Sequence, residues 1–451
     1  MIMKKTVILL TALLLAGVSL AAQSFEPSLF LDGYRLGYRY NPALQNEDNF
    51  LSIGEFRNQT RNTFGAASFL YPRGEEVVTA LHPSVSADEF LGSLGDNNTL
   101  GGSIDYNLVS YGWRKGASYQ TLEANVRAAY KANVPKDIFT ILKLGTGDTN
   151  YTMGGLSLGG NALVELAYGY SHQVADWLSL GLRTKLLVGI DALHYNVSRM
   201  DIHLAEDQYR LDLEANLDLT SRWSKIRPDE EGYLDLTRLS AKDRWKLPSG
   251  VGLAMDLGVV LTPLEGLTLS ASLLDLGGML WYYGNAGQSQ GTAAFTGVKN
   301  LSLDDIKAGS IRSQFDDVLD ALGSSLKVKA LEGRTALEFI PFHVHAGIRY
   351  DLPFYRALSI GATGNYLHVS GFSYAEGRGV LAWNPWKWLG IAANAGRGTY
   401  GPVWGVAANV AVKQFRLTAG YSDGFGGTVP YTSTPLKPNN RVFTLGLTYD
   451  L

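Results

Sequence analysis

The sequence contains no cysteine among its 451 residues. Lipid attachment to an exported protein requires a cysteine at the new N-terminus, so a lipoprotein is excluded. Disulfides are excluded as well, which argues against a small secreted domain stabilised by them. Charged residues make up only 18% of the chain, the formal net charge is −3, and no basic stretch stands out. A nucleic-acid partner is therefore not expected, because binding a phosphate backbone needs clustered Lys and Arg.

Long hydrophobic runs are also missing. Although 46% of the residues are hydrophobic, no apolar run after residue 22 is long enough for a helix that crosses a membrane. The chain is instead rich in glycine (51) and in tyrosine (24), with 9 tryptophans. This composition is typical of a transmembrane β-barrel, in which lipid-facing residues alternate with polar residues that face the lumen.

The first 22 residues have the pattern of a secretory signal peptide. Lys4 and Lys5 form a short positive region, residues 6–20 form a short apolar core, and residues 19–22 supply small side chains. A run this short, ending in small residues, is removed by signal peptidase and is no membrane span. Cleavage after Ala21 or Ala22 fits equally well. The pattern predicts export, and together with the composition it predicts an outer-membrane location.

Two-residue alternation is the strongest structural signal. At the C-terminus, apolar residues from Phe443 to Leu451 alternate with small or polar ones, so one face of a strand is wholly apolar. The predicted fold is therefore all-β, a transmembrane antiparallel barrel. The same alternation recurs in residues 122–130, 162–172, 178–190, 209–219, 251–261, 340–350, 358–368, 388–397, 402–413 and 415–423.

Connection lengths support the barrel. Short links and long connections fall on opposite sides when strands are counted back from the last one, as expected when the short turns face the periplasm. Two short loops, near Ser370 and at residues 398–401, fall on the outer side, which this arrangement permits. The count gives 14 strands, or 16 if the ambiguous hairpin 191–221 enters the membrane. Residues 61–451 are predicted to form the barrel. The insert 285–337 is predicted to lie outside with a short helix over residues 302–322, because Ser302 can cap it and apolar residues share one face.

Two motifs carry a resemblance to a known family. Asn41-Pro42-Ala43 stands near the mature N-terminus, and residues 250–258 and 269–277 form a paired hairpin whose halves end in Asp256-Leu-Gly258 and Asp275-Leu-Gly277. These residues resemble the FadL-like outer-membrane proteins, most closely their uncharacterised branch, and PorV-like members belong to the same broad group. The resemblance implies a 14-strand barrel with an N-terminal hatch over residues 23–60 inside the lumen. It also implies passage of small hydrophobic compounds across the outer membrane.

Charged and histidine residues on predicted inward faces are the candidate lumen residues. Asp256 and Asp275 could form an acid–base pair, but ion pairs with lumen arginines or bonds to hatch amides are favoured, with a bulge at Asp275. His343 and His345 share one inward face, yet a metal needs three or four converging ligands and none accompany them. The full set is Glu123, Arg127, Glu165, Arg183, Lys185, Asp256, Asp275, His343, His345 and Arg349.

No catalytic, cofactor or metal site is predicted. The seven histidines show no Ser/Asp partner motif, so an outer-membrane enzyme such as a lipase is the weakest hypothesis. The leading hypothesis is passage of small hydrophobic compounds, with membrane lipid as the surrounding partner. The alternative is a barrel that transports nothing and serves protein secretion or surface assembly through its external loops. No particular protein partner can be predicted.

Overall fold

The computed structural model describes residues 29–74, 76–144, 151–204, 209–221, 225–240, 248–295, 327–369, 372–424 and 437–451. The predicted signal peptide (1–22) and the predicted helix over 302–322 lie outside the described residues. Within that part of the chain, no helix is long and apolar enough to cross a membrane.

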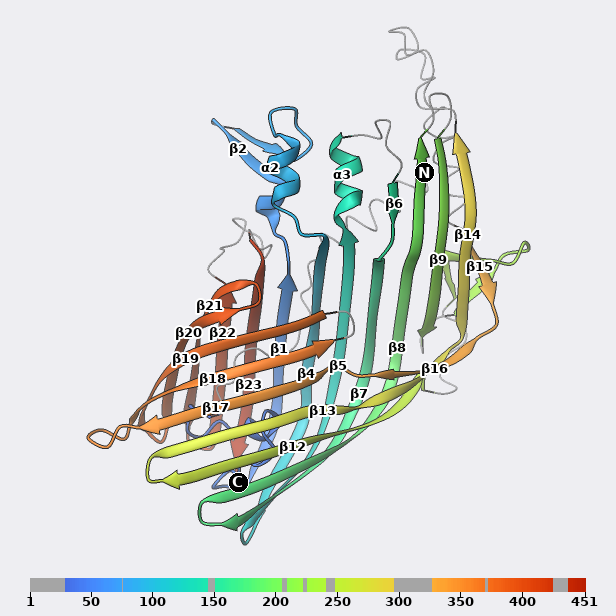
Figure 1. Cartoon of the computed structure of the whole chain (residues 1–451). Helices are drawn as coiled ribbons and strands as arrows, with labels where there is room; N and C mark the ends of the chain where they lie inside the picture. The colour runs from blue at the N-terminus through green and yellow to red at the C-terminus, as the bar shows by residue number, and fades with distance from the viewer. Residues whose placement is uncertain are drawn as a thin grey trace.

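The described strands form a closed antiparallel barrel of 14 strands (Figure 1). The first strand closes the ring, because it pairs with the last strand on one side and with β4 on the other. The barrel strands are β1 (Phe50–Asn62), β4 (Asn97–Lys115), β5 (Ser118–Pro135), β7 (Leu156–Ala175), β8 (Leu178–Leu204), β12 (Gly250–Leu264), β13 (Leu267–Tyr283), β17 (Phe342–Asp351), β18 (Leu358–Val369), β19 (Phe372–Trp386), β20 (Leu389–Gly398), β21 (Gly401–Val412), β22 (Phe415–Gly424) and β23 (Asn439–Asp450).

The predicted alternation sorts side chains between lipid and lumen. On β8, Leu180, Leu182 and Leu186 are exposed on the outer surface, whereas Arg183 and Lys185 are buried inside the barrel. On β12, Leu253 is 70% exposed while Asp256 is fully buried. An apolar band this exposed is stable only against hydrocarbon, so the fold is a transmembrane barrel, as predicted.

Short connections gather at one end of the barrel, together with exposed aromatic rings, although a two-residue link joins β20 to β21 at the other end. Trp386 and Trp388 stack with their ring centroids 5.1 Å apart beside the β19–β20 turn, and Phe354 in the β17–β18 turn is 81% exposed. Aromatic rings favour the interface between lipid and water. This end is therefore the periplasmic one, in agreement with the loop-length argument.

The predicted boundary between hatch and barrel at residue 60 is wrong. Residues 50–62 form β1, which hydrogen-bonds to β23 and β4 along its length. The period-two signal fails here for two reasons: the register shifts between Ser52 and Gly54, and the outward positions Asn58 and Thr60 are polar. The barrel therefore begins at Phe50, eleven residues before the predicted start.

The possibility of 16 strands is also wrong. The alternating segment 209–219 forms β9, which pairs with the outer part of β8 and with β14 and does not join the closed ring. The insert that was predicted to contain a helix contributes strands at both of its ends. Outside the ring lie β9 (Tyr209–Ser221), β10 (Lys225–Pro228), β11 (Tyr233–Ser240), β14 (Asn285–Phe295), β15 (Val328–Leu331) and β16 (Arg334–Phe339).

A second external region packs around phenylalanine rings. Phe69 lies 5.8 Å from Phe90 and 5.6 Å from Phe139, measured between ring centroids. These rings join the loop between β1 and β4 to the end of β5 and give that region its own small core. Its elements are η2 (Ala66–Ser68), β2 (Leu70–Arg73), β3 (Glu76–Thr79), α2 (Ala87–Gly92), α3 (Lys136–Leu144) and, beside them, β6 (Tyr151–Met153).

Replacing a central lipid-facing leucine tests the membrane-spanning band. In Leu182→Arg, a cation enters hydrocarbon, and we expect the free energy of unfolding from a phosphatidylcholine bilayer to fall by about 2–4 kcal/mol. The measurement is a urea titration followed by tryptophan fluorescence. Val77→Arg is the matched control, because Val77 is also apolar and exposed but lies on the external hairpin. Equal losses in both variants would contradict the placement of the band.

Candidate functional site

Residues 29–49, named here the lumen segment, run through the periplasmic half of the barrel interior (Figure 1, dark blue). The chain is buried for most of this length and includes the short helix η1 (Gly37–Arg39). Its backbone polar groups are satisfied by the wall: Asn384 Nδ2 donates to Phe30 O (2.9 Å), and Asn409 Nδ2 donates to Asp32 O (3.0 Å). Polar side chains on inward faces thus replace the water that an irregular segment otherwise needs.

The Asn41-Pro42-Ala43 motif anchors this segment to the wall. Asn41 is fully buried, and its Nδ2 donates to Ser270 Oγ (2.8 Å) and Val259 O (3.0 Å), on β13 and β12. Its Oδ1 accepts from Ala43 N (2.9 Å), which fixes the turn. Satisfying both ends of a buried amide holds the side chain in one orientation.

Glycines on the facing strands make room for this turn. A Cβ at Gly258 would overlap Asn41 Oδ1 and Pro42 Cδ, and a Cβ at Gly181 would overlap the backbone of Pro42 and Ala43. The resemblance marked Gly258 as part of a motif, and the structure gives the reason: only glycine permits such a close approach of two backbones.

Arg39 connects the lumen segment to three carboxylates of the barrel. Its guanidinium lies 3.1 Å from Glu55 on β1, 2.5 Å from Asp105 on β4 and 3.4 Å from Glu123 on β5. Burial disfavours the charge on Arg39, but Asp105, Glu123 and Glu55 outweigh it, so the pKa of the guanidinium is raised well above its ordinary value. Arg39 stays charged, and the ion pairs hold the segment against the wall.

The predicted inward charges continue this arrangement across the lumen. Arg183 contacts Glu123, Glu165 (2.7 Å) and Asp256 (2.7 Å). Lys185 then bridges Asp256 (2.7 Å) and Asp275 (2.6 Å). We name the whole set the ionic layer: Arg39, Glu55, Asp105, Glu123, Arg127, Glu165, Arg183, Lys185, Asp256 and Asp275.

The paired Asp256 and Asp275 are structural partners of cations, as favoured over an acid–base pair. Arg127 binds both oxygens of Asp275 at 2.9 Å, and Asp275 N donates to Asp256 Oδ1 at 2.7 Å. Asp275 has φ 64° and lies where the β12–β13 register shifts, so the predicted bulge is present. At Gly277 a Cβ would overlap Leu253 O and Ala254, which explains the glycine that follows the bulge.

The remaining predicted residues lie in two separate places. His343 reaches within 4.0 Å of Asp275 and stacks on His345, with ring centroids 6.0 Å apart. His345 Nδ1 contacts Asn365 on β18. Arg349 lies nearer the periplasmic end of β17, where it binds Asp32 at 2.7 Å and donates to Leu29 O at 3.1 Å. Arg349 therefore holds the lumen segment, while the two histidines line the layer's edge.

Sequence reasoning missed several members of the layer. Arg39 was assigned to the hatch without a role, and Glu55 and Arg57 were placed in the hatch although they point inward from β1. A register shift between Asn107 and Val109 separates Asp105 and Asn107 from the inward Ser110 of the same strand. The signal that could have found them is charge on strands next to an apolar band, since a buried charge needs a partner.

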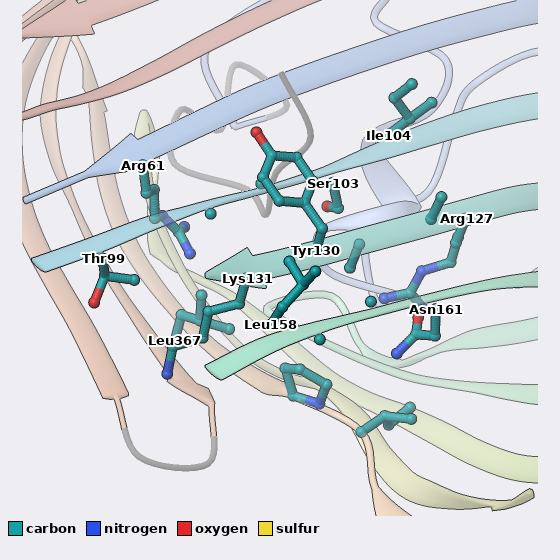
Figure 2. Close-up of a pocket in the computed structure, with 18 of the residues that line it drawn as sticks. Arg61, Thr99, Ser103, Ile104, Arg127, Tyr130, Lys131, Leu158, Asn161 and Leu367 are labelled. Carbon is teal, nitrogen blue, oxygen red and sulfur yellow. The ribbon is translucent and has the colours of Figure 1, made fainter. Parts of the chain in front are cut away.

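A cavity of about 510 Å³ lies directly beyond the ionic layer, on the side of the long connections (Figure 2). Its floor includes Arg57, Asp105 and Arg127, and its opposite side is formed by Ile340, Pro341 and Leu367. At Ile340 and Pro341 the wall changes partner, because β13 pairs with β17 below this point and with β16 above it. The cavity is therefore closed towards the periplasm by the layer and the lumen segment.

Comparison with known proteins identifies a family. The model of a family of unknown function, DUF5723, matches residues 42–421, from the lumen segment to β22. The chain belongs to the DUF5723 family. A search of curated proteins finds no match.

The chain is also similar to solved structures of other proteins. A FadL homologue of Pseudomonas aeruginosa is 12% identical, with 96% of this chain and 99% of that chain covered and a TM-score of 0.49. The toluene transporter TodX of P. putida is 8% identical, with coverages of 97% and 96% and a TM-score of 0.43. The toluene transporter TbuX of Ralstonia pickettii is 8% identical, with coverages of 97% and 100% and a TM-score of 0.44.

The glycine contacts of this DUF5723 protein predict how the lumen segment is held. In Gly258→Ala the new methyl group displaces the Asn41 turn, so we expect residues 29–49 to be cleaved faster by added protease while the barrel stays folded. Gly377→Ala is the control, because a Cβ there meets no atom within 4 Å. Mass spectrometry of the fragments measures the rate. Unchanged cleavage in Gly258→Ala would refute the anchoring role.

The ionic layer predicts an unequal cost for two arginine substitutions. Arg183→Met removes a buried cation that Glu123, Glu165 and Asp256 share, and we expect it to lower the free energy of unfolding by about 3–5 kcal/mol. Arg334→Met removes a half-exposed cation paired with Asp218 on the external sheet, at an expected cost of about 0–1 kcal/mol. Urea unfolding measures both. Similar costs would show that the layer contributes no more than a surface pair.

Proposed function

We propose that this barrel passes small compounds across the outer membrane, through a lumen that residues 29–49 close on the periplasmic side. The cavity next to the ionic layer carries the proposal, since a lumen filled throughout would leave no place for cargo. Hydrophobic compounds are the class that the FadL-like resemblance implies. Leu163, Ile340, Pro341 and Leu367 supply apolar lining that supports contact with an apolar part of the cargo.

On the proposed route, the transported compound leaves the cavity either through the side wall of the barrel or past the lumen segment. For cargo to move towards the periplasm, the ion pairs of Arg39 must open. A sideways route is available where β13 changes its pairing partner at Ile340 and Pro341, because fewer hydrogen bonds join the strands at that point. Of the described strands, β16 pairs with β13 alone. Export by a cleaved signal peptide over residues 1–22 belongs to the same proposal, because the N-terminal pattern supports it.

A second candidate function is favoured by the external structure. The sheet β9–β14–β15–β11 and the phenylalanine core around α2 and α3 rise well beyond the membrane-spanning band. Ordered external elements of this size suit a barrel that docks other proteins during secretion or surface assembly. Such a role needs no cargo in the cavity, so an uptake measurement separates the two.

The experiment is uptake into vesicles whose outer leaflet contains lipopolysaccharide, since this leaflet slows hydrophobic compounds. Fatty acids and aromatic hydrocarbons are offered to vesicles with the intact protein, with a variant lacking residues 23–49, and with no protein. We expect saturable uptake with the intact protein and faster, non-saturating uptake with the shortened variant. Uptake equal to that of protein-free vesicles in both cases would refute the passage function and leave the docking role.

A further inference from the structure

Strand β16 leaves one of its edges without a partner strand in the described part of the chain. It pairs with β13 along Arg334–Phe339, and no other described strand pairs with it (Figure 1). On the other side of this part of the wall, the pairing with β18 starts only at Phe342. We name the unpaired side of these residues the free edge of β16.

Antiparallel pairing fixes which backbone groups lie on the free edge. Ile340 N donates to Gly277 O (3.2 Å), whereas Tyr282 N donates away from β16, to Ser249 O (2.8 Å). Because hydrogen bonds alternate along an antiparallel pair, every second residue of β16 bonds to β13. The other residues direct their N–H and C=O groups to the free edge: Thr335, Leu337 and Phe339.

The free edge lies at the level of the apolar band. Phe339 is 85% exposed and Leu337 is 65% exposed. Leu337 lies across from Leu280 of β13, which in turn lies across from Val251 of β12, and both face outward. Lipid chains offer neither donors nor acceptors, so unpaired backbone groups are costly at this level. A partner that supplies both kinds of group along the edge therefore stabilises the barrel in the membrane.

The sequence limits the free edge at its lower end. Pro341 is the next residue whose N–H would point to the open side, and proline has no N–H. From Phe342 onwards the chain pairs with β18. The unpaired donors of this part of the wall are thus confined to β16, where a short extended segment can reach all of them.

The two faces of β16 specify the chemistry of such a segment. Leu337 and Phe339 face outward, whereas Ala336 and Glu338 face inward, and Glu338 accepts a hydrogen bond from Tyr283 Oη (2.5 Å). An added strand continues both faces, with apolar side chains towards lipid and small or polar ones towards the lumen. Extended peptides add to open sheet edges in this way: main-chain hydrogen bonds give affinity, and alternate side chains give specificity.

We propose that the free edge of β16 binds an extended segment of a partner protein, which joins the wall as an additional antiparallel strand. A second copy of this barrel fits less well. Rotation about the membrane normal would bring its β16 alongside in the parallel direction, and parallel pairs are less stable. The inference goes beyond passage; it names the partner chemistry of the second candidate function, docking, and rests on that function.

The test is photocrosslinking of the full-length protein in its native host. The crosslinking residue p-benzoylphenylalanine is placed at Leu337 or Phe339. Leu253 is the lipid-facing control position, because it is 70% exposed on β12, which pairs with a strand on each side. We expect an adduct with one partner protein from positions 337 and 339 and none from position 253.

The register of the adducts separates an added strand from any other contact. Mass spectrometry identifies the linked partner residues, and we expect those linked to positions 337 and 339 to lie two apart in one segment with alternating apolar residues. Leu337→Pro removes a free N–H without removing a bond to β13, so the adduct at position 339 should fall several-fold. Leu337→Ala keeps the N–H and is the matched control. Heat-modified migration on gels verifies that each variant is a folded barrel.

Every other outcome overturns the proposal. It fails if positions 337 and 339 give no protein adduct, if they link to residues 296–326 of the same chain or to a second copy, or if the linked partner residues show no spacing of two. The same residue placed at Val77 on the external hairpin tests docking itself: a protein adduct there, without one at β16, would keep docking and refute the added strand. Uptake into vesicles tests passage independently of both.

Discussion

The ionic layer is the constraint on which the rest of the interior depends. Arg183 and Lys185 are buried at the centre of the barrel, and each needs carboxylates from neighbouring strands to offset the loss of water. Together, the carboxylates of the layer come from β1, β4, β5, β7, β12 and β13, so the layer ties a large part of the wall together. Arg39 extends it to the lumen segment. One set of ion pairs therefore fixes both the barrel's inner shape and the position of the chain that closes it.

The layer also divides the lumen into two parts with different contents. Towards the periplasm, the irregular lumen segment fills the space and is held by Asn384, Asn409 and Arg349. Towards the outside, the same strands leave a cavity whose lining combines charged residues such as Arg57 and Arg127 with apolar ones such as Leu163. The glycines at 181 and 258 matter to this division, because they let the Asn41 turn sit directly against the wall.

The sequence predicted the barrel because its signal is repeated. Alternation over β8, β12 and β23 arises because one face of each strand contacts lipid and the other contacts protein. The short turns indicate which end of the barrel is periplasmic. Prediction failed where that repetition breaks. The shift at Ser52 and Gly54 hid β1, and the clean alternation of β9 reflects packing against Leu234 and Val328 in an external sheet. A two-residue alternation does not show whether the apolar face contacts lipid or other side chains of the protein.

The residues of the candidate site were likewise predicted only in part. Asp256, Asp275, Arg183 and Lys185 were found because they lie on predicted strands, but Arg39, which pairs with Glu123 of the same layer, lies in the lumen segment outside any strand. The resemblance implied hydrophobic cargo, and the cavity of this chain has a mixed lining of apolar and charged residues that the short shared motifs do not cover.

Hydrogen–deuterium exchange of residues 29–49 in lipid bilayers tests the central claim most directly. If the ionic layer holds this segment closed, its amides exchange as slowly as those of the barrel strands in the intact protein, and much faster in Arg39→Gln. The barrel strands themselves stay protected in that variant. Rapid exchange of residues 29–49 in the intact protein, or equal exchange with and without Arg39, would contradict it.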